Sequence, residues 1–191
     1  FDGIYDMALR KKNANTDRPD GQKYAEITRI RLGTRLPVYL PQRITKEFVK
    51  VLADFKRKAS KIGIKQFIVQ IHVQAAIEIT PEMKEAVSRI LAAGWMVTNQ
   101  VVFTAAASRR GHTNKLRKVL NDIGVISYYT FSVKGFMENY HNFATNERSV
   151  QEKTEEKIIG KLSKELLNQV ADLYVDVEHA QKNLAEIRKA H

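Results

Sequence analysis

Four short apolar runs alternate with amphipathic segments through the middle of the chain. The runs cover residues 27–32, 66–73, 95–103 and 125–131. The expected strand starts, near residues 27, 66, 95 and 124, lie 39, 29 and 29 residues apart, which is the length of a repeated strand–helix unit. Strands that alternate with helices favour a parallel sheet with helices outside it. The pattern therefore predicts an α/β protein, either barrel-like or an open doubly wound sheet.

The segments between the runs carry recognisable helix boundaries. Thr45 is suited to cap a helix whose apolar residues 48, 49, 52 and 55 fall on one face. The sequence Thr80-Pro81-Glu82 supplies a capping hydroxyl, a proline at the first helical position and an acid in the first turn. Gly94 and Gly124 stand where the C-terminal caps of the next two helices are expected.

The two ends of the chain differ from this repeated part. Residues 1–23 contain a helix-like piece and a polar loop, and two segments rich in lysine and glutamate, 149–160 and 163–190, have the pattern of helices. We therefore expect three parts: an N-terminal helix and loop (1–23), a portion of βα repeats (24–146) and a helical C-terminal extension (147–191). The apolar stripe of the last helix suits packing on the repeats or on another chain.

Polar residues stand where each expected strand ends. Ligands of parallel α/β sheets bind at the carboxyl ends of the strands, so these residues are the candidates for a binding site. Each also has an ordinary structural explanation, such as a buried histidine, a capping amide or a surface charge. The candidates are Arg35 after the first strand, His72 ending the second, Asn99 and Gln100 ending the third, and Lys134 after the fourth.

The composition excludes several classes of chemistry. The chain has no cysteine, so it holds no disulfide, no cysteine nucleophile and no thiolate-bound zinc or iron–sulfur cluster. The five histidines have no metal-ligand spacing, and no glycine-rich phosphate loop follows a strand. No apolar run approaches the roughly 20 residues of a membrane span. We expect no metal site, no membrane partner and a cytoplasmic location.

The chain is strongly basic. It carries 32 lysines and arginines against 21 acids, a net charge of +11. The positive residues form short clusters without a long basic tract, so nucleic acid is not the expected partner. A basic α/β module that binds phosphate-bearing ligands or nucleic acid remains the alternative function, and a protein that assembles through its last helix is a third.

One stretch of the chain resembles a known family. The segment 33–45, Gly-Thr-Arg-Leu-Pro-Val-Tyr-Leu-Pro-Gln-Arg-Ile-Thr, resembles the region after a central strand of lysine 2,3-aminomutases, which are radical S-adenosylmethionine enzymes. The resemblance continues in order through Gln70-Ile-His72, Glu78-Ile-Thr80, Asn99-Gln100 and Tyr128-Tyr129. It extends over residues 25–146, and the first motif is the most specific.

The resemblance implies a partial TIM-type barrel and an isomerase. Family members cleave S-adenosylmethionine at a 4Fe–4S iron–sulfur cluster and move the amino group of an amino acid bound to pyridoxal phosphate from C2 to C3. It also implies that Arg35, His72, Asn99 and Gln100 face S-adenosylmethionine or pyridoxal phosphate.

The family's cysteine motif and pyridoxal-binding lysine segment are absent from this chain. We therefore expect an internal fragment of a divergent parent enzyme. No residue of this chain is assigned a catalytic role, and we expect the chain to have no activity by itself. A part of a barrel exposes sheet edges, so we also expect a homo-oligomer.

The chain departs from the family's sequence pattern in two further ways. The first bears on the substrate, and the second indicates a divergent branch of the family. Lysine-specific members carry an aspartate, which pairs with the distal ammonium of lysine, at the position of Lys134. A lysine repels that ammonium and pairs with a carboxylate, so the resemblance implies an acidic substrate such as glutamate. Residues 104–112 and 142–145 replace two loop motifs of the family.

Overall fold

The computed structural model describes residues 1–132, 139, 141–145, 163 and 165, and it confirms the α/β class. The strands are β1 (Arg29–Gly33), β2 (Gln66–Ile71), β3 (Met96–Val102) and β4 (Val125–Phe131). The helices are α1 (Asp2–Ala14), α2 (Leu36–Tyr39), α3 (Lys46–Ser60), α4 (Pro81–Ala92) and α5 (His112–Asp122), with short 3-10 turns at Pro41–Arg43, Ala76–Glu78 and Ala106–Ser108.

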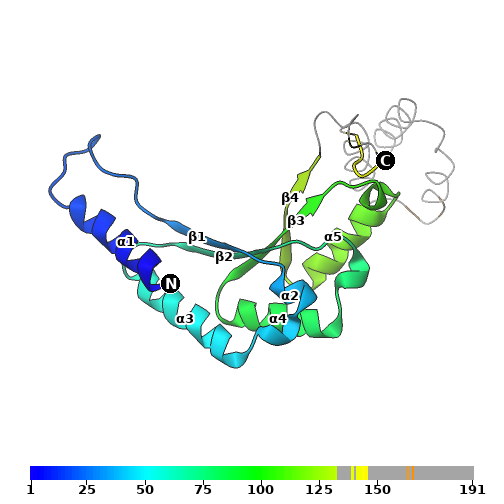
Figure 1. Ribbon diagram of the computed structural model, residues 1–191, viewed down its shortest axis with the longest axis horizontal. Coiled ribbons are helices and arrows are strands. Elements are labelled where there is room, and N and C mark those ends of the chain that lie inside the picture. Colours follow the sequence, from blue (N-terminus) through cyan, green and yellow to red (C-terminus); the bar gives the residue numbers. More distant parts are fainter. Residues whose placement is uncertain (133–138, 140, 146–162, 164, 166–191) are drawn as a thin grey trace. The chain divides into compact units, whose positions relative to one another are not determined.

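The strands form one sheet in chain order, β1-β2-β3-β4. β1 and β2 pair in parallel with Arg29 opposite Gln66, and β2 and β3 pair in parallel with Ile68 opposite Met96. Sequential strands that pair in parallel need a crossover between them, and α3 and α4 supply it for these two pairs (Figure 1). The parallel arrangement expected from the strand–helix alternation is thus present.

The helix boundaries read from the sequence are confirmed. The Thr45 hydroxyl accepts a hydrogen bond from the backbone N–H of Phe48, and the Thr80 hydroxyl accepts one from Met83. Gly124 has a φ of +79°, a conformation that costs any residue with a Cβ, and an added Cβ would lie 2.8 Å from Leu91 Cδ1. Local chemistry therefore sets where these elements begin and end.

One face of the sheet carries the hydrophobic core. Phe67, Val69 and Ile71 alternate along β2 and are buried against the helices. Trp95, directly before β3, packs edge-on against Phe67 and donates its indole N–H to the carbonyl of Leu52 in α3 at 2.9 Å. Each such large side chain contributes about 1.5–3 kcal/mol through burial. This packing fixes α3 and α4 on the sheet.

Three details differ from the sequence prediction. β3 continues to Val102, so the expectation that the third strand ends at Asn99-Gln100 is wrong. Asn99 lies inside the strand because its amide pairs with the backbone of Val73. β1 begins at Arg29, two residues later than expected. The connection after β1, for which the sequence analysis named no helix, forms α2 and a 3-10 turn, and each has a proline in its first two positions.

The described residues divide into two compact units. The first contains residues 1–73, 78–99 and 121–128, and the second contains 74–77, 100–120 and the residues from 129 onward. The division expected from the sequence, at residues 23 and 146, stays a prediction. Lys134 and the expected helix at 149–160 lie outside the described residues. So does the expected helix at 163–190, apart from residues 163 and 165. Across the described part of the chain, every helix is too short or too polar to span a bilayer.

Candidate functional site

The turn after β1 positions the first candidate residue. β1 ends at Gly33, and the backbone N–H of Thr34 still donates to the carbonyl of Gln70 at 2.9 Å. The Thr34 hydroxyl then accepts a hydrogen bond from the N–H of Leu36 at 3.0 Å, which turns the chain into α2. Arg35 occupies the N-cap position of this helix, at the carboxyl end of β1.

Three groups surround the Arg35 guanidinium. Its Nη2 lies 3.3 Å from Glu78 Oε2, and its central carbon lies 3.9 Å from the centre of the Tyr39 ring. Its Nε is buried and has no hydrogen-bond partner among the described residues. The ring and the carboxylate together hold the guanidinium in one orientation, with a donor to spare. An oriented cation at the end of a parallel strand is suited to bind an oxyanion.

Glu78 is the residue that the sequence analysis missed. It belongs to the Glu78-Ile-Thr80 motif quoted for the resemblance, but no role was assigned to it. Its side chain is 20% exposed, so it lies in a partly desolvated place where a carboxylate needs a cation. One clue was present in the sequence. Glu78 is an acid in a motif that was already expected at the same end of the sheet as Arg35.

Asn99 uses its side chain to continue the pairing of β2 with β3. It is opposite Ile71, the last residue of β2, and is 1% exposed. Its Oδ1 accepts from the N–H of Val73 at 2.7 Å, and its Nδ2 donates to the carbonyl of Val73 at 3.1 Å. The amide thus replaces the backbone partner that the sheet no longer supplies. One amide hydrogen and one lone pair remain for any ligand, so its expected cofactor contact stays a prediction.

The remaining candidates are placed less fully. His72 follows β2 directly and is partly buried, beside the peptide of Val73 that Asn99 holds. Gln100 lies inside β3, also partly buried, in the second unit. Their cofactor contacts, like that of Arg35, stay predictions, and Lys134 lies outside the described residues.

In the second unit, the residues after β3 pair with a segment near residue 143. The N–H of Ala105 donates to the carbonyl of Asn142, and that of Ala144 donates to Phe103, both at 3.0 Å. Gln74 donates through Nε2 to Thr104 Oγ1 at 3.2 Å, and its carbonyl lies 2.9 Å from His112 Nε2. Segments 104–112 and 142–145 therefore belong to one hydrogen-bonded structure, and their departure from the family's loop motifs stays a prediction.

Two carboxyl groups of the described residues, those of Glu47 and Glu82, have pKa values below the ordinary 4.5. The N–H of its own backbone and then the Thr45 hydroxyl lower the pKa of Glu47, and the same groups at Glu82 and Thr80 lower that of Glu82. Both acids are exposed and lie at helix starts, so they stabilise α3 and α4. Within the residues that the structure describes, no three His, Cys, Asp or Glu side chains are grouped to hold a metal.

Several known proteins are similar in sequence to this chain. No family model matches it. A KamA family protein of Methanocaldococcus jannaschii is 38% identical over 127 residues, or 66% of this chain, and the L-lysine 2,3-aminomutase of Methanococcus maripaludis is 32% identical over 110 residues. The glutamate 2,3-aminomutase of Clostridioides difficile is 33% identical over 106 residues. The chain is 2,3-aminomutase-like.

The resemblance inferred from the motifs is thereby confirmed. The last two relatives match over 57% and 55% of this chain. The chain itself spans only 19% of the length of the first relative and 23% of each of the other two. The ion pair between Arg35 and Glu78 connects two of the motifs that carry this 2,3-aminomutase resemblance.

Proposed function

We propose that this chain forms part of an amino acid 2,3-aminomutase, an isomerase that moves an amino group from C2 to C3. The observation that carries the proposal is the similarity to a lysine and a glutamate 2,3-aminomutase along more than half of the chain. The proposed architecture is part of a TIM-type barrel, which the parallel order β1-β2-β3-β4 supports.

The proposed cofactors of the parent enzyme are S-adenosylmethionine, a 4Fe–4S cluster and pyridoxal phosphate. The cluster does not fit this chain, which has no cysteine and, where it is described, no grouped metal ligands. Its ligands therefore belong to other parts of the parent. S-adenosylmethionine and pyridoxal phosphate each carry an oxyanion, and the spare buried Nε of Arg35 suits such a group.

In this proposal the residues of the chain bind and orient the reactants, while the bound cofactors supply the radical and the electron sink. Arg35 holds an oxyanion, and Glu78 and Tyr39 keep its guanidinium aligned. His72, which directly follows β2, and Gln100, which lies in β3, are each proposed to contact a cofactor. Asn99 fixes the peptide of Val73 next to His72, so it positions that histidine whether or not it touches a ligand.

The proposed substrate is an acidic amino acid such as glutamate. Lys134 stands where lysine-specific enzymes of the family carry an aspartate, and an ammonium group there attracts a side-chain carboxylate and repels the ammonium of lysine. The proposed partners are this substrate and a second copy of the chain. The chain by itself is proposed to be inactive, because it lacks the cluster ligands.

The test uses the full-length parent enzyme, reconstituted with iron, sulfide, pyridoxal phosphate and S-adenosylmethionine. We expect conversion of glutamate to its β-amino isomer, detected by mass spectrometry, and much weaker conversion of lysine. Lys134→Asp should shift the preference toward lysine, and Arg57→Gln, an exposed charge change on α3, should not. The Methanococcus maripaludis enzyme, assayed on lysine in parallel, validates the conditions. No isomer from any amino acid, while that control works, would overturn the proposal.

A further inference from the structure

The loop between α1 and β1 presents an Asp-Gly pair to solvent. This connection runs over residues 15–28 and is far longer than the roughly 2–6 residues usual between a helix and the next strand. Asp20 and Gly21 lie near its middle. The side chain of Asp20 is 95% exposed, and a Cβ added to Gly21 would meet no atom within 4 Å. Both residues are therefore accessible and uncrowded.

The base of the loop is held by one buried amide. Asn15 is 5% exposed, its Nδ2 donates to the carbonyl of Tyr24 at 3.0 Å, and its Oδ1 accepts from the N–H of Tyr24 at 2.8 Å. The same Nδ2 donates to Glu26 Oε1 at 2.9 Å. Both ends of segment 16–23 are thus fixed at Asn15, so a change of conformation within this segment need not disturb α1 or β1.

The tip of the loop is held more weakly than its base. The N–H of Gln22 donates to the carbonyl of Pro19 at 3.1 Å, which closes a β-turn with Asp20 and Gly21 in its middle. Gly21 has a φ of +86°, and its own N–H has no hydrogen-bond partner among the described residues. A solvent-exposed turn with so few hydrogen bonds opens at low free-energy cost.

An aspartate followed by glycine can react with its own backbone. When Gly21 N attacks Asp20 Cγ, a new C–N bond closes a succinimide ring, and the carboxyl oxygen leaves as water. Water then adds to one of the two ring carbonyls. Cleavage between Gly21 N and Cγ restores aspartate, whereas cleavage between Gly21 N and the Asp20 backbone carbonyl leaves the chain running through Cγ, which is isoaspartate. One water is lost and one is gained, so no further reactant is needed.

The chain carries the same pair a second time, in a different structure. Asp2-Gly3 lies in the first turn of α1, and the ring of Phe1 packs 4.4 Å from that of Phe55, which holds this end of the helix. Closing the succinimide requires a change in ψ of the aspartate. In α1 that change breaks helical structure, whereas in the turn at 19–22 it breaks only the hydrogen bonds of the tip.

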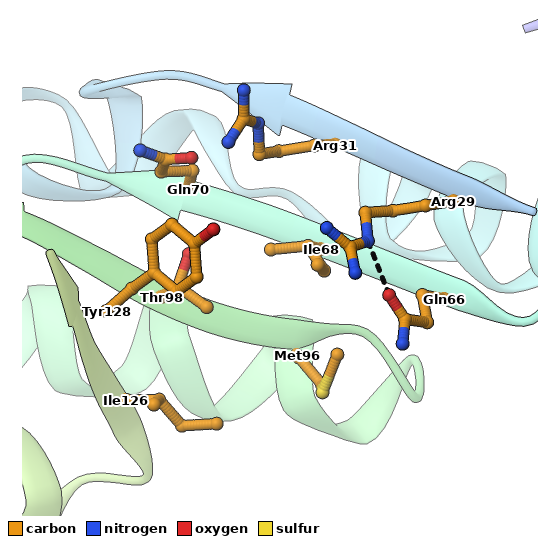
Figure 2. A pocket seen from close by; sticks show the side chains of 9 residues that line it. All are labelled: Arg29, Arg31, Gln66, Ile68, Gln70, Met96, Thr98, Ile126 and Tyr128. Carbon is orange, nitrogen blue, oxygen red and sulfur yellow. Dashed lines mark hydrogen bonds between the residues drawn. The ribbon is translucent and has the colours of Figure 1, made fainter.

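The loop is separate from the places described above. The candidate cofactor residues lie toward the carboxyl ends of the strands, whereas residues 15–28 lead into the amino end of β1. A cavity on one face of the sheet, with Ile68 and Met96 in its wall, is lined entirely by residues of β1, β2, β3 and β4 (Figure 2). An inference from the loop therefore goes beyond the proposed aminomutase function and does not rest on it.

We propose that Asp20-Gly21 is a modification site, at which the folded chain converts Asp20 to isoaspartate through a succinimide. The conversion inserts a methylene group into the backbone and displaces the carboxylate, whose Oδ1 lies 2.7 Å from Lys23 Nζ. It leaves a free α-carboxylate on the loop surface. That group is the substrate of isoaspartyl carboxyl methyltransferases, so an enzyme of this class is the partner that fits the modified loop.

The experiment follows both Asp-Gly pairs of the 191-residue chain during incubation at neutral pH in heavy-oxygen water. Mass spectrometry with electron-transfer fragmentation distinguishes isoaspartate from aspartate at each position and detects the incorporated oxygen. We expect isoaspartate to form several-fold faster at Asp20 than at Asp2 in the folded chain. In urea the two rates should become similar, because both pairs then lack structure.

Variants test the role of each group. Gly21→Ala should slow isomerisation at Asp20 several-fold, since the methyl group hinders attack by the nitrogen, and the open space there limits the structural cost to the positive φ. Gly3→Ala makes the same change at the other pair and should leave the rate at Asp20 unchanged. Asp20→Asn should form isoaspartate faster, because a neutral amide is attacked more easily than an ionised carboxylate.

Four results would overturn the proposal. The first is an equal rate at Asp20 and Asp2 in the folded chain, and the second is isoaspartate at Asp20 that forms only in urea. The third is a Gly21→Ala variant that reacts as fast as the unchanged chain. The fourth is isoaspartate without heavy oxygen, which would exclude the succinimide route.

Discussion

Arg35 Nη2 lies 3.3 Å from Glu78 Oε2, and this ion pair joins the carboxyl end of β1 to the turn before α4. The two residues are 43 positions apart in the chain. Because the Tyr39 ring contacts the same guanidinium, Arg35 is held from two sides. The pair therefore orients a cation at the predicted rim.

The ion pair is expected to orient Arg35 without contributing much stability. Arg35 is 39% exposed, so Glu78→Gln should lower the free energy of unfolding by about 0–1 kcal/mol. In the parent enzyme the same change should raise the Michaelis constant for an anionic ligand more than it lowers the turnover number. Denaturant titration and steady-state kinetics measure the two effects. A loss of stability above about 2 kcal/mol would show that the pair is structural.

Asn99 is expected to be a major contributor to stability. Asn99→Ala leaves both the N–H and the carbonyl of Val73 without their buried partner, so we expect a loss of about 2–4 kcal/mol. Thr98→Val changes the neighbouring residue on the opposite face and removes a hydroxyl that has no hydrogen-bond partner among the described residues, so it should change stability by less than about 1 kcal/mol. Chemical denaturation compares them. Equal effects of the two changes would contradict the role given to Asn99.

Two features of Gly124 disfavour a larger residue, its positive φ and its closeness to Leu91, and substitutions can test them separately. Gly124→Ala places a Cβ at φ +79° and 2.8 Å from Leu91 Cδ1, so we expect a loss of more than about 1–2 kcal/mol. Gly63→Ala has a positive φ of +101° but open space, and should lose only the conformational part. Gly33→Ala, with neither constraint, is the control. Thermal unfolding ranks the three, and a Gly63 variant as unstable as the Gly124 variant would exclude a contribution from Leu91.

Acid should weaken the starts of α3 and α4. The pKa of Glu47 and that of Glu82 are lower in the folded chain than the ordinary 4.5, so their stabilising effect is present above that value. It is lost as the pH falls through the lowered folded pKa values. Glu82→Gln should flatten the pH dependence of stability in this range, and Lys84→Gln, in the same helix, should not. Unchanged profiles would refute the linkage.

The cap of α4 gives a related test. Thr80→Ala removes the hydroxyl that accepts from Met83 and should lower the free energy of unfolding by about 1 kcal/mol. It should also raise the pKa of Glu82 toward 4.5, since the Thr80 hydroxyl is the second of the two groups that lower it. Thr80→Ser keeps the hydroxyl and should restore both properties. Carboxyl titration by nuclear magnetic resonance follows the pKa, and a serine variant that behaves like alanine would contradict this assignment.

The four strands, the helix caps at Thr45 and Thr80 and the stop at Gly124 were predictable because each depends on residues adjacent in the chain. The end of β3 was mispredicted for the opposite reason. Asn99 looks like a terminating polar residue until its partner, Val73, is known. The same limit hid Glu78, whose role depends on Arg35.

The sequence by itself determined the α/β class, the order of strands and helices, and the motifs shared with 2,3-aminomutases, because periodicity, capping and motif order are local or linear properties. The tertiary structure decided which polar groups meet. It pairs the Asn99 amide with the peptide of Val73 and the Arg35 guanidinium with Glu78. Such pairings follow from strand register and from the face on which each side chain lies, which are fixed only when distant segments pack together.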